Sequence, residues 1–537
     1  MGESSGDMDR ISDLPSFIAH RIMCSLSTKE VAQTSVLSKR WKYLKDSFPI
    51  LDFNENYFFG VEFETEMESF EKFCERLKNF IKFVDDSLFR FCKLQLCMHA
   101  FRLSISFDDV NELPASLDKW IGLAVQNCVK EMDLNLRPTR SYRYNLPQAI
   151  FYAKSVTSLK LHGCKMEQLF GSMRLHSLRK LILYDIHTNE EMIQRVVSDC
   201  RMLEELSFIF CRGLKCYCII SRLLKLKIIR IYSPPNEVER ITICVPSLQE
   251  FALLFDRQRM PCMINMYDCH RLSDLHLGGA FFKDMQFHDL ISRFPLLENL
   301  RVECCHSLEK VTVASNQLKN LRFGGCSKLR EIDIYAPNLR SFSYVNNPIP
   351  VSSINAPCRW RVGFLNGSDP DTQWYISMKE FLGVSNQIED LILYFTSRKH
   401  FFSLEEFQEH LPWLPFVVGN LSLYTHALLS SDYGALLDGV LCLCHPKSLS
   451  VITWGREQNK FIKWLNEELT NKDAKCCNAR DIKCWRHYLQ GFKIESFSKL
   501  EDYKPIRIDN TDVLPNLPQG TLRFRLDWCY PILAKNP

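Results

Sequence analysis

The sequence predicts an α/β protein in which a small helical module precedes a solenoid of strand-containing repeats, curved as a horseshoe and closed by an irregular C-terminal cap. Two patterns indicate this fold. Apolar residues recur at helical spacing in the first fifty residues, and a strand motif recurs at near-constant intervals between residues 129 and 344. The composition agrees, since 46% hydrophobic and 24% charged residues are typical of a packed soluble protein. The 67 Lys and Arg nearly balance the 63 Asp and Glu, so no nucleic-acid partner is predicted.

The N-terminal module, residues 8–53, is predicted to begin with an amphipathic helix. Pro15 follows Leu14 at its start, and proline suits a first turn because its missing N–H is not needed there. An apolar stripe then continues at steps of four residues through Ile18, Ile22 and Leu26. So short a module has a poor core of its own, and the stripe is therefore expected to pack on a partner helix.

A second helix is predicted to start at Ser27, because Ser27 and Glu30 have the spacing of a capping box. Its apolar positions would be Val31, Val36, Leu37, Trp41 and Leu44. The helix dipole favours positive charge at a C-terminal end, which is where this helix would carry Lys39, Arg40 and Lys42.

The module resembles the F-box of plant F-box/leucine-rich-repeat proteins, including the FBD type. The resemblance rests on the LP pair, the TKE step and the run TSVLSKRW within RISDLPSFIAHRIMCSLSTKEVAQTSVLSKRWKYL. The segment departs from the usual motif where Ser16-Phe17 replaces a frequent acidic pair and where Ser27 replaces a frequent proline. Neither change removes an apolar contact.

The resemblance implies a Skp-family adaptor as partner and, through it, the cullin and RING subunits of an SCF-type ubiquitin ligase. Adaptor contacts are predicted at Leu14, Pro15, Ile18, Ile22, Leu26, Val31, Leu37 and Trp41. For Leu37 and Trp41, packing within the module is a strong alternative. For the whole module, the alternative is a helical cap with no partner.

Residues 54–118 are predicted to connect the module to the solenoid. A solvated acidic surface is expected there, formed by Glu55, Glu62, Glu64, Glu66, Glu68, Glu71 and Glu75. Residues 117–136 are predicted to form a helix that leads into the first clear strand.

The solenoid is predicted over residues 119–430, regular to about residue 345 and irregular after it. Ten strands share the pattern apolar-x-x-apolar-x-apolar. Their middle residues are spaced by 21 to 27 residues, about 23 on average, within the leucine-rich-repeat range of about 20–29. These middle residues are Met132, Leu159, Leu181, Leu206, Ile229, Phe251, Leu275, Leu300, Leu321 and Phe342. Cysteines that share one repeat position are predicted to be buried core thiols, namely Cys164, Cys211, Cys305 and Cys326.

Alternate residues of each strand would point outward onto the concave face of the sheet, where both signs of charge mix with aromatic rings. Such a surface suits a protein target better than a phosphate backbone. The alternative, for any single residue, is a solvated face without a ligand. Target contacts are predicted at Lys160, His162, Lys180, Tyr184, Arg230, Tyr232, His276, Arg301 and Arg322.

Residues 431–537 are predicted to add further repeats and a cap. A helix is expected at 461–469, and residues 484–497 resemble the C-terminal part of the same plant proteins, which would cover the last repeat. The uncharged run Leu411–Ser431 contains two prolines and several polar residues. We therefore predict a loop followed by a strand, and no membrane span.

The predicted function is target recognition, without catalysis. No nucleotide-binding, hydrolase or zinc-protease motif occurs, and none of the 23 cysteines forms a C-x-x-C pair, so no cofactor or metal is expected. The start of the chain has no apolar run, so we expect an intracellular protein with reduced thiols, in the cytoplasm, the nucleus or both.

Two other functions stay open. One, implied by the same resemblance, is a hormone or small-molecule co-receptor of the F-box/leucine-rich-repeat type. Its basic pocket would use concave-face cations, which Glu205, Asp274 and Glu303 interrupt, namely Lys160, Lys180, Arg230, Arg301 and Arg322. The other is an F-box scaffold that acts outside any ligase.

Overall fold

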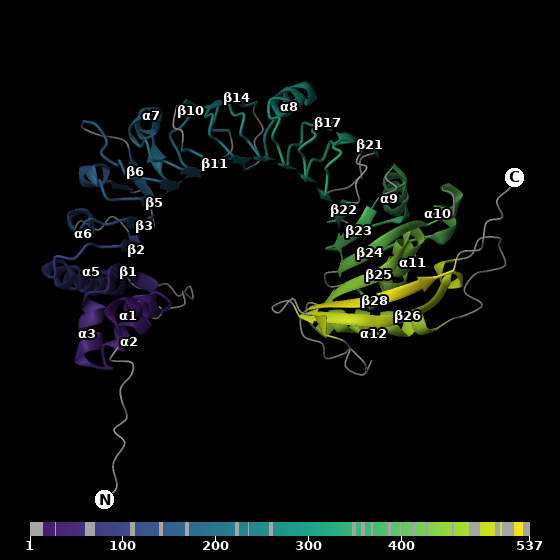
Figure 1. Cartoon of the computed structure of the whole chain (residues 1–537), viewed down its shortest axis with the longest axis horizontal. Helices are drawn as coiled ribbons and strands as arrows, with labels where there is room; N and C mark the ends of the chain where they lie inside the picture. The colour runs from purple at the N-terminus through teal and green to yellow at the C-terminus, as the bar shows by residue number, and fades with distance from the viewer. Residues whose placement is uncertain are drawn as a thin grey trace, which may run out of the picture. The chain divides into compact units, whose positions relative to one another are not determined.

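A computed structural model describes residues 14–26, 28–59, 70–107, 113–138, 143–166, 171–220, 225–234, 236–256, 261–345, 351–355, 360–366, 369–384, 388–397, 399–410, 415–425, 428–453, 456–471, 484–499, 505–506 and 520–529. The chain forms two compact units, one of residues 1–256 with 262–269 and one of residues 257–261 with 270–537. Each unit is built on a long sheet of mostly parallel strands (Figure 1).

The first unit begins with three short helices, drawn in purple in Figure 1. They are α1 (Ser16–Met23), α2 (Thr28–Thr34) and α3 (Lys39–Asp46). The buried core between them consists of Ala19, Met23, Val31, Trp41, Leu44 and Phe48. A compact helical module is therefore confirmed.

The predicted second helix is in fact two helices. Ser38 caps α3, since its side chain accepts a hydrogen bond from the Trp41 N–H at 3.2 Å. The cations at Lys39, Arg40 and Lys42 therefore begin a helix and do not end one. Ser27, the predicted cap of the second helix, lies outside the described residues.

Eight parallel strands form the main sheet of the first unit. In order they are β1 (Ile50–Asn54), β2 (Ala100–Phe107), β3 (Glu131–Pro138), β5 (Ser158–His162), β7 (Lys180–Tyr184), β9 (Glu205–Ile209), β11 (Ile228–Ser233) and β13 (Glu250–Phe255). The predicted repeat positions are in register, because Met132 pairs with Leu159 and Leu159 with Leu181, and the series continues to Phe251. β2 lies in the predicted connector, so the sheet begins earlier than the periodicity indicated.

One glutamate of the predicted acidic surface is a core residue. Glu55 begins α4 (Glu55–Phe59), is 4% exposed and accepts a hydrogen bond from the Ser106 N–H at 2.6 Å. Burial raises the pKa of this carboxyl. Glu75 is exposed as predicted. Outside the described residues and side chains lie Glu62, Glu64, Glu66, Glu68 and Glu71.

Helices and short strands line one side of the first unit's main sheet (Figure 1). The helices are α5 (Phe70–Lys93), α6 (Leu113–Gln126) and α7 (Glu190–Asp199). The short strands are β4 (Tyr144–Asn145), β6 (Cys164–Met166), β8 (His187–Thr188), β10 (Cys216–Ile220), β12 (Arg240–Cys244) and β14 (Met263–Tyr267). The helix and strand predicted at 117–136 are confirmed as α6 and β3. We call the other side of each main sheet its open face.

The second unit continues the same plan. Its parallel strands are β15 (Asp274–Gly278), β16 (Asn299–Glu303), β18 (Asn320–Gly324), β20 (Ser341–Val345), β22 (Trp360–Asn366), β23 (Ile388–Phe395), β24 (Phe416–Thr425) and β25 (Cys444–Thr453). Leu391 pairs with Leu421, which confirms two of the predicted irregular repeats. The remaining elements beside this sheet are β17 (Lys310–Ala314), β19 (Glu331–Tyr335), β21 (Val351–Asn355), α8 (Asp284–Ile291), α9 (Thr372–Val384), α10 (Leu404–His410) and α11 (Tyr433–Leu443).

An antiparallel pair of strands covers the edge of β25. β28 (Gly520–Trp528) pairs with β25, and β26 (Leu489–Lys499) pairs with β28. The predicted helix at 461–469 is confirmed as part of α12 (Arg456–Thr470). Arg486 holds the cap segment in place, since its guanidinium lies 3.0 Å from Asp438 and 2.6 Å from Glu468.

The four cysteines that share a repeat position are buried and free, as predicted, and burial raises the pKa of each thiol. Within the described part of the chain, no three His, Cys, Asp or Glu side chains gather as a metal site would require. The uncharged run contributes β24, and its residues 411–414 lie outside the described residues. No described helix is long and apolar enough to span a membrane.

Candidate protein-interaction surfaces

Among its described residues, the helical module leaves four large side chains without polar atoms in contact with solvent, besides the exposed ring of Tyr43. Their exposed fractions are 70% for Phe17, 41% for Ile22, 84% for Val36 and 56% for Leu37. We call these four residues the module surface. A folded domain normally buries such side chains where it can, so their concentration in one small module is typical of a protein-binding site.

The structure separates the eight predicted adaptor contacts. Pro15, Ile22 and Leu37 are exposed, whereas Leu14, Ile18 and Leu26 are half-buried. The prediction of adaptor contacts at Val31 and Trp41 needs correction. These side chains are 8% and 2% exposed and belong to the module's own core.

Leu37 lies outside the core because α2 ends three residues earlier. The Thr34 hydroxyl donates a hydrogen bond to the Val31 carbonyl at 2.7 Å at the end of this helix. The chain then turns, so Val36 and Leu37 do not continue the buried face. Sequence reasoning missed Phe17 and Val36 as candidate contacts. The available signal for Phe17 was an apolar side chain off the predicted stripe.

Charged side chains on the open face of the first unit pair across neighbouring strands. Lys180 Nζ lies 2.7 Å from Glu205, and the Arg230 guanidinium lies 2.6 Å from Glu205 and 2.8 Å from Glu250. Lys160 Nζ lies 3.4 Å from a β3 carboxylate in the same way. Parallel register places the same repeat position of each strand in one row, so opposite charges on adjacent repeats meet.

An aromatic row crosses the C-terminal ends of the same strands. The His162 and Tyr184 rings pack edge to face with centroids 4.4 Å apart, and the Tyr184 and Phe210 centroids are 6.0 Å apart. Tyr232 occupies the same register on β11. Phe210 was not predicted because it follows β9 at a positive φ of 53°, outside the strand alternation. Burial lowers the pKa of His162, so the site favours the neutral ring.

The predicted contacts of the second unit gather around Glu303. His276 Nε2 lies 3.3 Å from one Glu303 oxygen, and Arg322 Nε lies 3.1 Å from the other. The hydrogen bond with His276 is the largest cause that lowers the pKa of Glu303, and the charges of Arg322 and Arg301 act in the same direction. Arg301 has no carboxylate within ion-pair distance among the described residues.

These ion pairs argue against the anionic co-receptor. Of the five cations that would form its pocket, Lys160, Lys180, Arg230 and Arg322 each have a carboxylate within 4.0 Å. An anionic ligand would have to compete with those carboxylates, and this competition reduces any gain in binding free energy.

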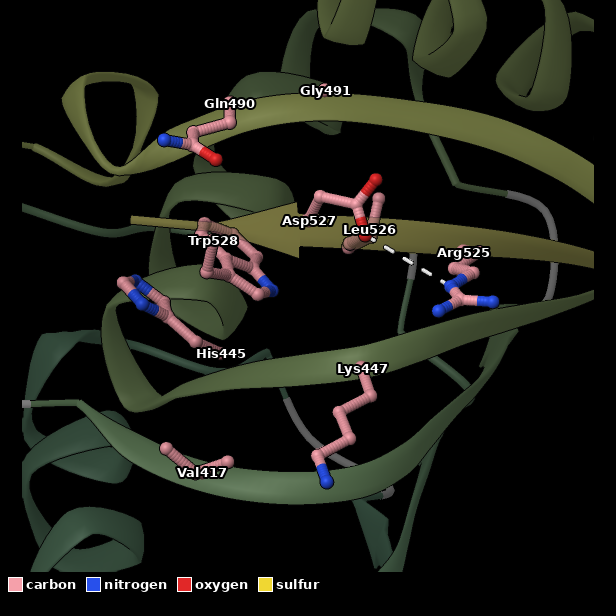
Figure 2. A pocket seen from close by; sticks show the side chains of 9 residues that line it. All are labelled: Val417, His445, Lys447, Gln490, Gly491, Arg525, Leu526, Asp527 and Trp528. Atoms are coloured by element: carbon pink, nitrogen blue, oxygen red, sulfur yellow. Dashed lines mark ion pairs between the residues drawn. The ribbon is translucent and has the colours of Figure 1, made fainter. Parts of the chain in front are cut away.

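A pocket of about 730 Å³ lies where β24, β25, β26 and β28 meet (Figure 2). One wall is the indole of Trp528, which stacks on the His445 ring with centroids 3.9 Å apart. Burial lowers the pKa of His445 to about 3, so this wall is neutral at pH 7. The charged lining residues are Lys447, Arg525 and Asp527. The sequence did not predict this pocket because β26 and β28 follow no repeat pattern.

Two family models match the chain. An F-box domain matches residues 11–53, and the domain described as "At1g61320/AtMIF1, LRR domain" matches residues 94–266 and 260–402. The second match alone covers more than half of the 537 residues. The chain belongs to the plant F-box/leucine-rich-repeat family. F-box/leucine-rich-repeat proteins are generally non-catalytic interaction modules, and an F-box domain generally binds Skp-family adaptors.

The chain is also similar to several F-box proteins of Arabidopsis thaliana. A putative F-box/LRR-repeat protein is 31% identical, over 37% of this chain and 36% of its own length. A second F-box/LRR-repeat protein is 32% identical, over 38% of this chain and 50% of its own length. A putative FBD-associated F-box protein is 26% identical, over 60% of this chain and 66% of its own length. The chain thus spans between about a third and two thirds of the length of these relatives.

Proposed function

We propose that this F-box/leucine-rich-repeat chain is the substrate-recognition subunit of an SCF-type ubiquitin ligase in the cytoplasm or nucleus. The F-box would bind a Skp-family adaptor, which links it to cullin and RING subunits, and the repeats would bind the target protein. The main support is the module surface, because Phe17, Val36 and Leu37 stay exposed although the module already has a complete core. A partner that covers them would gain the free energy of burying their apolar area.

The open faces support a protein as the target. Charges in fixed ion pairs are complementary to few surfaces, so they favour specificity over general attraction to anions. The aromatic row adds Tyr184 and Phe210, which are 39% and 41% exposed. Aromatic side chains of this kind are enriched in protein interfaces because they bury large areas at small entropic cost.

The chain itself would contribute proximity to the reaction. A target held on the repeats stays close to the ubiquitin-charged conjugating enzyme recruited by the RING subunit, so transfer becomes effectively intramolecular. No described residue needs to act as an acid, base or nucleophile in this role.

Reconstitution tests the proposal. The full chain is co-expressed with an Arabidopsis Skp-family adaptor, cullin and RING subunit, and the proteins are separated by size-exclusion chromatography. We expect one complex that contains all four chains. A chain that binds the adaptor without recruiting cullin would instead be an F-box scaffold, and a chain that fails to bind the adaptor would contradict the proposal altogether.

A further inference from the structure

We infer that the C-terminal end of the second unit's open face binds an extended acidic segment of a protein, with Arg523 and Arg525 each contacting one anionic side chain. The inference rests on the proposed function, which gives the open face a protein target. It adds a site, in the cap strands, that neither the repeat pattern nor the family models identify.

Two rows of side chains cross the open face at this end, as the strand register shows. One row runs through Arg361, Asp390, Asn420, Ser448, Arg525 and Lys493. The next row runs through Ser422, Ser450, Arg523 and Ser496. Each row thus begins with neutral or paired side chains and reaches cations at β28 or β26.

The cations at this end lack the close carboxylate partners that Arg322 and Arg361 have on the same face. Arg361 lies 3.3 Å from Asp390, whereas no described carboxylate lies within ion-pair distance of Arg523 or Lys493. Among the described carboxylates, Arg525 pairs with Asp527 of its own strand alone, at 3.9 Å and with both side chains more than half exposed. An exposed pair at that distance contributes little, so Arg525 remains available to a ligand (Figure 2).

A network of neutral groups orients one of the two guanidinium groups. Arg523 Nε donates a hydrogen bond to the Ser450 hydroxyl at 3.3 Å, and that hydroxyl donates to Asn420 Oδ1 at 3.0 Å. Ser448 donates to the same Asn420 oxygen at 3.3 Å. Because Ser450 is 2% exposed, the network is anchored in the sheet, and the two terminal nitrogens of Arg523 are left for a planar oxyanion.

The spacing of the two arginines points to an extended chain. Arg523 and Arg525 are two residues apart on one strand face, about 7 Å along the strand. A small anion could contact one of them well, whereas a peptide in extended conformation carries side chains i and i+2 at that same repeat. The fitting ligand therefore has acidic or phosphorylated residues at alternate positions.

The pocket beside Arg525 gives the segment a place for a neighbouring side chain. Its Trp528 wall is fixed by the stack on His445 and by a hydrogen bond from the indole N–H to the Pro446 carbonyl at 2.7 Å. A rigid indole face suits an apolar or aromatic side chain next to the acidic pair. Lys447 lines the same pocket and adds to the positive potential.

Degenerate peptide pools test the inference. Nonapeptide pools that differ only at positions 4 and 6, which hold Glu, phosphoserine or Ser, are passed over the immobilised full chain at low ionic strength, and the retained peptide is quantified. We expect at least fivefold greater retention of the Glu or phosphoserine pool than of the Ser pool. Retention of the phosphoserine pool without the Glu pool would show that the bound segment has to be phosphorylated. Equal retention of all three pools would overturn the inference.

Substitutions locate the site. The double variant Arg523→Gln with Arg525→Gln is expected to lose the preference for acidic pools, whereas Arg361→Gln, which removes a paired cation of the same face, is expected to keep it. An unchanged preference in the double variant would overturn the assignment, as would complete displacement of the pool by an equal concentration of inorganic phosphate. Adaptor binding is measured on the same preparations, so a chain that binds adaptor but no acidic pool contradicts this inference alone.

Discussion

Removing exposed apolar side chains from the module surface should weaken adaptor binding without unfolding the module. Complete burial of a Phe or Leu side chain contributes about 1.5–3 kcal/mol. Phe17 is 70% exposed and Leu37 is 56% exposed, so more than half of that contribution is still available to a partner. We therefore expect Phe17→Ala with Leu37→Ala to cost about 3 kcal/mol of binding free energy, which is about a 100-fold rise in Kd.

Calorimetric titration of the purified chain with the adaptor measures this change, and thermal unfolding of each variant measures stability. Met285→Ala is the matched control, because Met285 is 71% exposed and lies in the second unit, so its Kd should not change. Trp41→Ala should instead unfold the module, at a cost of about 3–5 kcal/mol, since this ring is 2% exposed. A Kd within threefold of the parent for the Phe17 and Leu37 double variant would refute the role of the module surface.

Further predictions concern the second unit. Because burial lowers the pKa of His445 to about 3, the unfolded chain takes up a proton below about pH 6.5 that the folded chain does not. The contribution of His445 to the free energy of unfolding should thus fall by about 1.4 kcal/mol for each unit by which the pH is lowered from about 6.5 towards 3. Urea unfolding at pH 7 and pH 5 measures this loss, and His445→Phe should remove the part due to His445. Gly439→Ala should destabilise α11 by about 1–3 kcal/mol, because the new Cβ would lie 2.5 Å from a buried tyrosine ring, whereas Gly434→Ala in the same helix meets nothing within 4 Å and should not destabilise it. Cys304 is exposed and Cys305 is buried, so a thiol reagent followed by peptide mass spectrometry should label Cys304 and leave Cys305 unlabelled in the folded chain. Equal labelling of both would contradict the repeat packing.

The repeat positions could be predicted because a buried parallel strand repeats the same apolar spacing. Leu159, Leu300 and Leu421 were found in this way, and each is in register with its neighbours. The same logic failed for β2, whose strand lies outside the repeat series, and for Glu55, whose burial depends on a backbone partner 51 residues away. Contacts that join distant segments leave no local period in a sequence.

The candidate surfaces were harder to predict than the fold. Helical periodicity identified Trp41 as apolar but could not tell a core position from a contact. It also joined two helices, whereas in the structure α2 ends at Thr34 and Ser38 caps α3. On the open face, strand alternation indicated which residues point outward, but which of them form ion pairs depends on the register. Glu205 forms ion pairs with both Lys180 and Arg230, and the sequence around either cation does not reveal this shared partner.

Positive charge is left over where the antiparallel strand β28 joins the parallel run. Within the parallel run, each row repeats one position of successive repeats, so a cation on one strand can be matched by an acid on the next, as Arg361 is by Asp390. β28 enters in the opposite direction, so its residues face row partners that belong to no shared repeat position. Arg523 faces Ser450 and Arg525 faces Ser448, so the last parallel strand offers neither arginine a carboxylate. An acidic segment would supply a carboxylate at an end of the sheet where binding to the two arginines displaces no close ion pair among the described residues.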